Sequence, residues 1–380
     1  MKVMIVVTHL LGTGHLSRAL NLAAAFEASG HSAVVASGGV PPAHLERPKG
    51  RFQQLPPVTS NGVDFSRLLH PDGTPATEDT LADREKMLID LLHREKPDAL
   101  ITELFPFGRR ILKAEFLALL DAATHLPAPR IFASIRDILA PPSKPRKAAF
   151  AEDVVARFYD AVIVHSDPDI TPLDLSWPVS DTLASRLRYS GFVAPPPVAP
   201  HPDNPGAGEV LVSAGGGPVG DALYLAARAA ARQDAGRRWR LLVGGTDAAD
   251  RCITLAQGAP DNVIVEPARP DFRQMLHHAA ASVSLCGYNT ALDLLQSGCP
   301  AVLVPFDAGQ EVEQGIRADA LARQPGFEVL RTTDLSAEAL LAAISRATAE
   351  PRAPAPPTLF EGAARTVQIV TEIAVEARHG

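Results

Sequence analysis

The sequence predicts an α/β protein made of two tandem Rossmann-like domains, each a doubly wound parallel sheet. Three observations support this prediction. Short apolar runs alternate with helix-like stretches, the runs are apolar throughout, as expected for strands covered on both faces, and the alternation starts again after a proline-rich break. Two such sheets would face each other across a cleft, with ligands bound beyond the carboxyl ends of their strands.

In the first half, five apolar runs each end in small or polar residues, as strands that lead into loops do. Between the first two runs, apolar residues from Leu16 to Phe26 recur at helical spacing, so an amphipathic helix is expected over 17–29. The predicted strands are residues 2–7, 32–37, 98–102, 130–135 and 160–165.

Six prolines and two glycines interrupt residues 194–208, which therefore read as a linker. The second half resumes the alternation and ends in a helix-like segment, 359–377, whose docking site the sequence does not reveal. We expect an N-terminal domain over 1–193, a C-terminal domain over 209–358 and a terminal helix within 359–380. The second set of predicted strands is 209–214, 240–245, 262–266, 281–286 and 300–305.

Composition narrows the class of protein. The 380 residues are 46% hydrophobic and 21% charged, as in globular proteins, and the net charge of −7 favours no nucleic-acid partner. The three cysteines have no metal or disulfide spacing, which fits a reducing cytoplasm. The first apolar run is too short for a signal peptide or a membrane span, and only peripheral membrane contact stays open.

The first strand leads into "LLGTGHLSR", a glycine pair that opens a helix and so suits an anion. It fails as a dinucleotide fingerprint because Ser17 replaces the third glycine and the second strand ends in "SGG" rather than an acid. The sequence has no P-loop motif. The alternative is a simple tight turn between strand and helix, but histidine is not a residue that such a turn selects at position 15.

Two further loops follow strands of the second half. Residues 215–217 are consecutive glycines before Pro218, a stronger phosphate cradle than the first loop. Asn289 and Thr290 are expected to cap the next helix, with Asp293 completing a capping box. The following strand leads into an acidic and amide cluster of the kind that binds sugar hydroxyls, namely Asp307, Gln310, Glu311, Glu313 and Gln314.

The segment "LCGYNTALDLLQSGCPAVLVPF" followed by "EVEQGIRADAL" resembles the donor-binding half of GT-B glycosyltransferases, in the MurG-like branch with a family 28 C-terminal domain. "HLLGTGHLSRALNLA" resembles the N-terminal glycine loop of that branch. With "TELFPFGRR", "SIRDIL" and "SAGGG", the chain is similar to bacterial MurG-like proteins described as predicted glycosyltransferases. The resemblance covers residues 2–322 and is looser over 40–98.

The resemblance implies roles for matching positions. Loops 215–217 and 287–290 would face the donor diphosphate, Asp293 the ribose, and Glu313 with Gln314 the sugar. Phe272 and Met275 would lie near the base, with uracil the default. The full set of substrate-binding candidates is Thr13, Gly14, Glu103, Arg136, Gly215, Gly216, Gly217, Phe272, Met275, Gly287, Tyr288, Asn289, Thr290, Asp293, Asp307, Glu313 and Gln314.

His15 is the candidate catalytic base. It follows a strand in the acceptor domain, and a helix N-terminus would keep its imidazole neutral. A contact to a phosphate or to the acceptor, or a purely structural role, remains open. Asp137 is the preferred carboxylate to orient it, with Glu103 as the alternative. "SDPDI", at 166–170, reads as a turn rather than a metal site.

These features predict an inverting, metal-independent glycosyltransferase that moves a hexosyl or N-acetylhexosaminyl group from a nucleotide sugar, a UDP-sugar by default, without a cofactor. The acceptor is a small molecule or a lipid-linked molecule; the latter would favour an apolar patch near Leu10, Leu11 and 105–107. The alternatives are a nucleotide-sugar 2-epimerase or UDP-sugar hydrolase on the same fold, and a non-catalytic nucleotide-sugar sensor.

Overall fold

The computed structural model describes residues 1–10, 13–41, 51–60, 67–127, 129–215, 219–307, 311–350 and 352–379. The chain forms two compact units. Unit 1 contains Met1–Val193 together with Glu361–Gly380, and unit 2 contains Ala194–Phe360. Each unit is described by itself below.

Unit 1 is built on a seven-stranded sheet with the order β3-β2-β1-β4-β5-β6-β7, in which every pair of neighbours is parallel. This is the doubly wound order: successive strands are added toward one edge up to β3 and toward the other edge from β4 on, so the strand order reverses between β1 and β4. The elements are β1 (Lys2–Val7), α1 (Gly14–Ala28), β2 (Ser32–Ser37), β3 (Arg51–Gln54), α2 (Glu78–Glu95), β4 (Ala99–Glu103), α3 (Lys113–Thr124), β5 (Arg130–Arg136), α4 (Pro145–Phe158), β6 (Ala161–His165), α5 (Asp181–Arg186), β7 (Leu187–Tyr189) and α12 (Gly362–His379).

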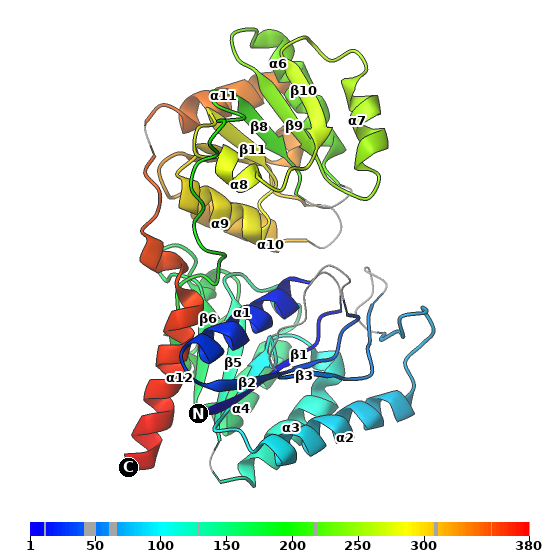
Figure 1. Cartoon of the computed structure of the whole chain (residues 1–380), viewed down its shortest axis with the longest axis vertical. Helices are drawn as coiled ribbons and strands as arrows, with labels where there is room; N and C mark the ends of the chain where they lie inside the picture. Colours follow the sequence, from blue (N-terminus) through cyan, green and yellow to red (C-terminus); the bar gives the residue numbers. More distant parts are fainter. Residues whose placement is uncertain are drawn as a thin grey trace. The chain divides into compact units, whose positions relative to one another are not determined.

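Helices cover both faces of this sheet (Figure 1). Alternate strand residues point to opposite faces, so Val3, Ile5 and Val7 pack with α1 and α12, whereas Met4 and Val6 pack with the side of α2, α3 and α4. These strand residues are at most 1% exposed, which explains why the strands read as unbroken apolar runs.

Unit 2 repeats the arrangement with a six-stranded parallel sheet, order β10-β9-β8-β11-β12-β13. Its reversal lies between β8 and β11. In Figure 1, α6 and α11 lie on one side of the sheet and α8 and α9 on the other. The elements are β8 (Val210–Ser213), α6 (Asp221–Gln233), β9 (Trp239–Val243), α7 (Ala248–Ala256), β10 (Val263–Pro267), α8 (Phe272–Met275), β11 (Ala281–Ser284), α9 (Tyr288–Ser297), β12 (Ala301–Leu303), α10 (Glu313–Leu321), β13 (Phe327–Val329) and α11 (Ala337–Ala347).

The predicted fold class is confirmed: two doubly wound parallel sheets in tandem. All ten predicted strands form, and the first helix begins at Gly14 rather than at residue 17. The sequence analysis missed β3, β7 and β13, and each of these is an edge strand of its sheet. An edge strand has one neighbour and is covered less completely, so "RFQQ", "LRY" and "FEV" carry polar residues and lack the apolar run of a central strand.

The proline tract and the terminal helix end up in different units. Residues 194–208 belong to unit 2, whereas α12 returns to unit 1 and packs on α1 and β5. The N–H of Gly362 donates to the Phe192 carbonyl at 3.0 Å. A side chain at Gly362 would come within 2.5 Å of the Gly191 carbonyl oxygen, so this close approach requires glycine.

The carboxyl ends of β1 and β2 are tied together by a buried guanidinium. Arg84 on α2 donates to both oxygens of Glu115 at 2.8 Å, and also to the Gly38 carbonyl at 2.9 Å, the Pro56 carbonyl at 2.6 Å and the Thr8 hydroxyl at 3.1 Å. Arg84 is 0% exposed and Glu115 4%. A charge this deeply buried is tolerated only with such compensation.

Glu115→Gln is therefore expected to destabilise the protein by about 3 to 5 kcal/mol, because the Arg84 charge stays buried without its counter-ion. Urea unfolding measures this loss. Asp121→Asn is the matched control, since the Asp121 ion pairs with His125 and Arg157 are largely exposed and should be worth under about 1 kcal/mol. Equal losses in the two variants would contradict the role assigned to Arg84.

Candidate active site

His15 is the second residue of α1, whose cap is Thr13. The helix begins where the loop from β1 ends, so His15 stands beside the point at which the strand order of unit 1 reverses. Its Nδ1 lies 2.9 Å from Oε1 of Glu103, the last residue of β4. The adjacent strands β1 and β4 thus bring together two residues that are 88 positions apart in the sequence.

The Glu103 carboxylate is almost completely buried, with its side chain 1% exposed. Oε1 accepts hydrogen bonds from Arg18, from Nε at 3.1 Å and from a terminal nitrogen at 2.5 Å, and Oε2 accepts one from the Ser134 hydroxyl at 2.5 Å. Burial acts to raise the pKa of Glu103, but the Arg18 charge and the His15 hydrogen bond outweigh it and hold the pKa well below its usual range. Glu103 is therefore an anion at neutral pH.

Burial lowers the pKa of His15 to about 4, against the opposing hydrogen bond of Glu103. The imidazole is therefore neutral at pH 7, as the sequence analysis expected, although burial is the main cause. Nδ1 lies 2.9 Å from the Glu103 carboxylate, which can only accept, and 3.2 Å from a terminal nitrogen of Arg18, which can only donate. The shorter contact, to Glu103, favours the neutral tautomer with its proton on Nδ1. Nε2 then carries the lone pair and can accept a proton.

Arg109 adds a second buried positive charge. Its Nε donates to the Thr8 carbonyl at 2.5 Å, and burial lowers its pKa to about 10 while Glu103 opposes the shift. The backbone of Arg109 is left-handed, with φ at 56°, and so is that of Leu104, with φ at 69°. Non-glycine residues adopt this conformation when the surroundings impose it, often near functional sites.

The carboxylate that orients His15 is Glu103 and not the preferred Asp137, because β4 rather than β5 lies next to β1. Asp137 is buried, and Arg136 donates from Nε to the Ile138 carbonyl at 3.0 Å. The apolar patch expected around 105–107 is also wrong. Phe105 stacks on Phe116 inside the core, and Leu10 is 3% exposed; Leu11 lies outside the described residues.

In unit 2, β8 ends at the start of the predicted phosphate loop. Gly215 has φ at 76°, a conformation that favours glycine, and its N–H donates to the Ser213 hydroxyl at 3.1 Å. Tyr224 supports the strand end by accepting from the Ala214 N–H at 3.1 Å and donating to the Leu242 carbonyl at 2.7 Å. Gly216 and Gly217 lie outside the described residues.

The capping box predicted for α9 is wrong. The cap is Gly287, and Asn289 and Thr290 lie within the first turn, because the helix begins at Tyr288. A side chain at Gly287 would meet no atom of the described residues within 4 Å, so the main chain is open to approach there. The first main-chain N–H groups of α9 nevertheless have no partner within the helix. They follow the end of β11, where the strand order of the second sheet reverses.

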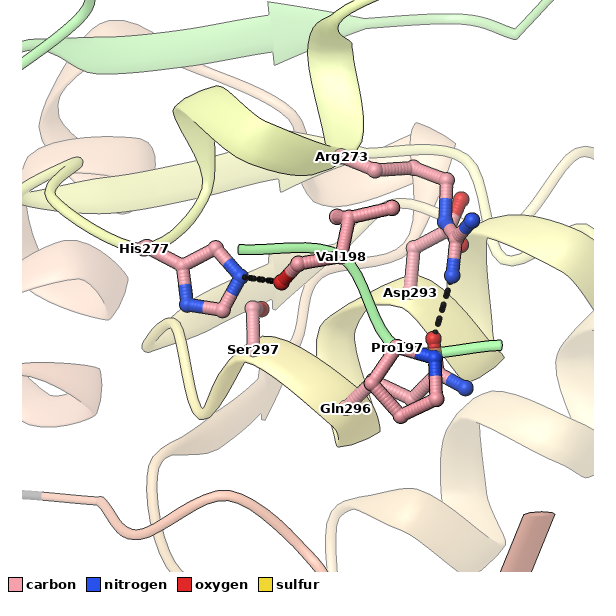
Figure 2. A pocket seen from close by; sticks show the side chains of 7 residues that line it. All are labelled: Pro197, Val198, Arg273, His277, Asp293, Gln296 and Ser297. Atoms are coloured by element: carbon pink, nitrogen blue, oxygen red, sulfur yellow. Dashed lines mark hydrogen bonds and ion pairs between the residues drawn. The ribbon is translucent and has the colours of Figure 1, made fainter. Parts of the chain in front are cut away.

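Asp293 forms an ion pair with Arg273 of α8, Oδ1 to Nε at 2.8 Å, instead of completing a capping box. Burial raises the pKa of Asp293 to about 6, against the opposing charge of Arg273. Arg273 also donates to the Pro196 carbonyl at 2.9 Å. Figure 2 shows the proline tract lying against this pair, where His277 contacts the Val198 carbonyl at 2.9 Å. The residues around this small hollow are Pro197, Val198, Arg273, His277, Asp293, Gln296 and Ser297.

The acidic and amide cluster after β12 is partly structural. Glu311 accepts from the N–H groups of Glu313 at 2.7 Å and Gln314 at 3.1 Å and so caps α10. The side-chain amide oxygen of Gln314 (Oε1) accepts from the Phe306 N–H at 3.1 Å. Asp307 is exposed, and Gln310 lies outside the described residues. Of the two base-site candidates, Met275 is buried and Phe272 is half-buried.

Sequence reasoning missed Arg317. This residue of α10 is 3% exposed, donates to the Cys286 carbonyl at 3.0 Å and lies 5.8 Å from the Tyr288 ring centroid. It therefore places a positive charge beside the N-terminus of α9. The signal was its position inside the quoted segment "EVEQGIRADAL", where an arginine follows the acidic residues.

Among the helices described, none is both long enough and apolar enough to cross a bilayer.

Residues 216–369 match the glycosyltransferase family 28 C-terminal domain. The UDP-N-acetylglucosamine--N-acetylmuramyl-(pentapeptide) pyrophosphoryl-undecaprenol N-acetylglucosamine transferase of Bartonella tribocorum is 30% identical over 87 residues, which are 23% of this chain and 23% of that protein. The matched part is thus less than a quarter of the length of that relative.

Solved structures share the fold over almost the whole chain. MurG of Acinetobacter baumannii has a TM-score of 0.66 and 15% identity, with 98% of this chain and 100% of that chain covered. The calicheamicin glycosyltransferase CalG4 has a TM-score of 0.61 and 18% identity, with 99% and 96% covered. The glycosyltransferase VinC in complex with dTDP has a TM-score of 0.60 and 16% identity, with both chains covered fully.

The Arg273–Asp293 pair predicts a pH-dependent mutational effect. In Arg273→Met, Asp293 loses its counter-ion, so its folded-state pKa rises above about 6. An acid whose pKa is higher in the folded state than in the unfolded chain costs stability increasingly as the pH rises, and the full cost is reached above the folded pKa. Wild type and variant differ in this cost only where wild-type Asp293 is ionised, above about pH 6, so the loss should be larger at pH 8 than at pH 5, by roughly 1 to 2 kcal/mol. Urea unfolding at the two pH values measures it. In an Asp293→Asn background, which lacks the titrating group, the same Arg273→Met change should cost an equal amount at both pH values.

Proposed function

We propose, on the premise that residues 216–369 carry a glycosyltransferase family 28 C-terminal domain on a MurG-like GT-B fold, that this chain transfers a sugar from a nucleotide-sugar donor to an acceptor hydroxyl. The observation that carries the proposal is the His15–Glu103 pair at the reversal point of the first sheet. A neutral imidazole with a free Nε2 lone pair, backed by a buried carboxylate, is suited to remove the acceptor proton.

The reaction requires that His15 become positively charged as the hydroxyl attacks the anomeric carbon. Glu103 supplies the compensating negative charge at 2.9 Å and keeps Nδ1 protonated, so that the free lone pair stays on Nε2. Attack by this hydroxyl opposite the leaving group inverts the anomeric configuration. The contact with Glu103 supports the role of general base over the other roles considered for His15.

The donor diphosphate is assigned to unit 2. Main-chain N–H groups at the start of α9, with the Arg317 charge nearby and the main chain at Gly215 open to approach, support stabilisation of a leaving nucleoside diphosphate. These groups supply positive potential from the protein itself, which supports transfer without a divalent metal. No cofactor beyond the donor is included in the proposal.

A UDP-sugar carrying a hexosyl or N-acetylhexosaminyl group is the proposed donor. The relative from Bartonella tribocorum is named for UDP-N-acetylglucosamine, which supports uracil over other bases. The acceptor is assigned to unit 1, where Arg18 and Arg109 leave the surroundings of His15 electropositive, and the name of that relative supports a lipid-linked acceptor. The proposed location of this chain is the cytoplasm, because its free cysteines suit a reducing compartment.

Replacing His15 by Asn is expected to lower kcat by about 100-fold or more, because the base is lost. Glu103→Gln should lower kcat by a similar factor, since the amide no longer compensates the imidazolium. Release of nucleoside diphosphate measures both. Near-normal turnover of a folded His15→Asn variant would remove His15 from the mechanism.

The pH dependence of kcat follows from the His15 pKa of about 4. The free imidazole is the active form, so turnover should stay level from pH 8 to about pH 5.5 and fall only as the pH approaches 4. A base at its ordinary pKa would instead lose half its activity near pH 6.5.

Donor recognition is tested first by thermal shift with UDP and dTDP, because a ligand of the native state raises its apparent stability. UDP should raise Tm more than dTDP. UDP-sugars are then incubated with the protein, alone and with an acceptor panel, and the anomer of the product is assigned by NMR. Sugar isomerisation or fast hydrolysis without an acceptor would favour an epimerase or a hydrolase, and retention of configuration would contradict the inverting mechanism.

A further inference from the structure

A row of hydrogen bonds runs away from Glu103 on the side opposite His15. The Ser134 hydroxyl, 2.5 Å from Glu103 Oε2, is 2.9 Å from His165 Nε2, and His165 Nδ1 is 2.9 Å from the Ser190 hydroxyl. The row is buried: Ser134 and His165 are 0% exposed and Ser190 is 4% exposed. It therefore lies within the interior of unit 1, where a polar group needs a partner.

The sheet aligns these side chains. Glu103 on β4 pairs in register with Ser134 on β5, and Ser134 pairs with Ile163 on β6. His165 is two residues beyond Ile163, so it points to the same face. Ser190 directly follows β7, the neighbour of β6, and the adjacent Gly191 N–H donates to the Ser166 carbonyl at 3.1 Å. Four neighbouring strands thus fix the geometry of the row.

The direction of every bond in the row is determined. Glu103 can only accept, so the Ser134 proton points to it, and the Ser134 oxygen must accept from His165 Nε2–H. Burial lowers the pKa of His165 to about 3, so the ring is neutral and Nδ1 must accept. The Ser190 hydroxyl also lies 2.9 Å from the Gly191 carbonyl, but His165 Nδ1 requires its proton because Nε2 is already a donor.

We propose that Ser134 and His165 are positioning residues for the transfer reaction: they hold the Glu103 carboxylate so that Oε1 faces His15, and thereby keep His15 in the Nδ1–H tautomer with Nε2 available as the base. The inference rests on the proposed function. It assigns no proton transfer to the row, whose members keep their protons throughout.

A buried polar contact can also be purely structural, and the same sheet offers a matched example. Thr102 Oγ1 and Tyr159 Oη lie 2.7 Å apart, both are buried, and Thr102 precedes Glu103 on β4. This pair makes no hydrogen bond to Glu103 among the described residues. Tyr159→Phe therefore removes the buried contact with Thr102, and a longer one of 3.4 Å to the Phe105 carbonyl, without touching the row.

The test is nitrogen-15 NMR of the histidine side chains, which reports the tautomer and pKa of His15 and needs no substrate. His15→Asn assigns the resonance among the twelve histidines. In Ser134→Ala and His165→Leu, the Nε2–H tautomer of His15 should gain population. The His15 pKa should rise by about 0.5 or more, because a carboxylate with fewer or weaker donors attracts the imidazolium more strongly. His165→Gln, which returns an N–H donor near Nε2, should restore both properties, and Tyr159→Phe should change neither.

Kinetics form the second arm. Ser134→Ala and His165→Leu should lower kcat by about 10-fold, with KM within about twofold, because ground-state binding does not involve the row. The inference is overturned if both folded variants keep the wild-type tautomer and pKa of His15, or if Tyr159→Phe shifts them equally. Should the wild-type protein transfer no sugar, the proposed function fails by itself, and the NMR result still decides whether the row positions Glu103.

Discussion

The buried carboxylate of Glu103 is the constraint on which the arrangement of unit 1 depends. An ion with 1% exposure is stable only when its oxygens are fully hydrogen-bonded and its charge is matched. Arg18 supplies the charge, and His15 and Ser134 supply further donors. His15 and Arg18 lie on α1 and Ser134 lies on β5, so satisfying one carboxylate at the end of β4 fixes α1, β4 and β5 relative to one another. The same requirement that stabilises the ion also orients the imidazole.

The position of this carboxylate follows from topology. In a doubly wound sheet, the loops after the two central strands diverge to opposite faces, which leaves the strand ends open at the reversal point. Glu103 ends one such strand, and α1, which carries His15 in its first turn, follows the other. Unit 2 has the same order, and Gly215 and the start of α9 follow its two central strands. One topological rule therefore explains why the candidate groups of both units follow the two central strands of their sheets.

The proline tract and the terminal helix show how local contacts override the simplest division of the chain. Residues 194–208 lack regular structure, yet Arg273, Gln296 and His277 bond to their carbonyl groups, so the tract is part of unit 2. Carbonyl oxygens of a proline-rich segment have no internal partners, and side-chain donors replace them. The terminal helix packs instead on α1, which buries its apolar face in unit 1.

The sequence by itself determined the fold class, ten of the strands and the glycine loops. Unbroken apolar runs reflect burial of a strand on both faces, and glycines reflect backbone conformations or close approaches that other residues disfavour. It also identified His15 and Glu103 as candidates. Only the tertiary structure decided that Glu103, and not Asp137, meets His15, since strand order decides which strand ends adjoin. The same holds for the edge strands, for the Gly287 cap and for the partner of Asp293. Each depends on contacts between residues distant in the sequence, for which spacing along the chain carries no signal.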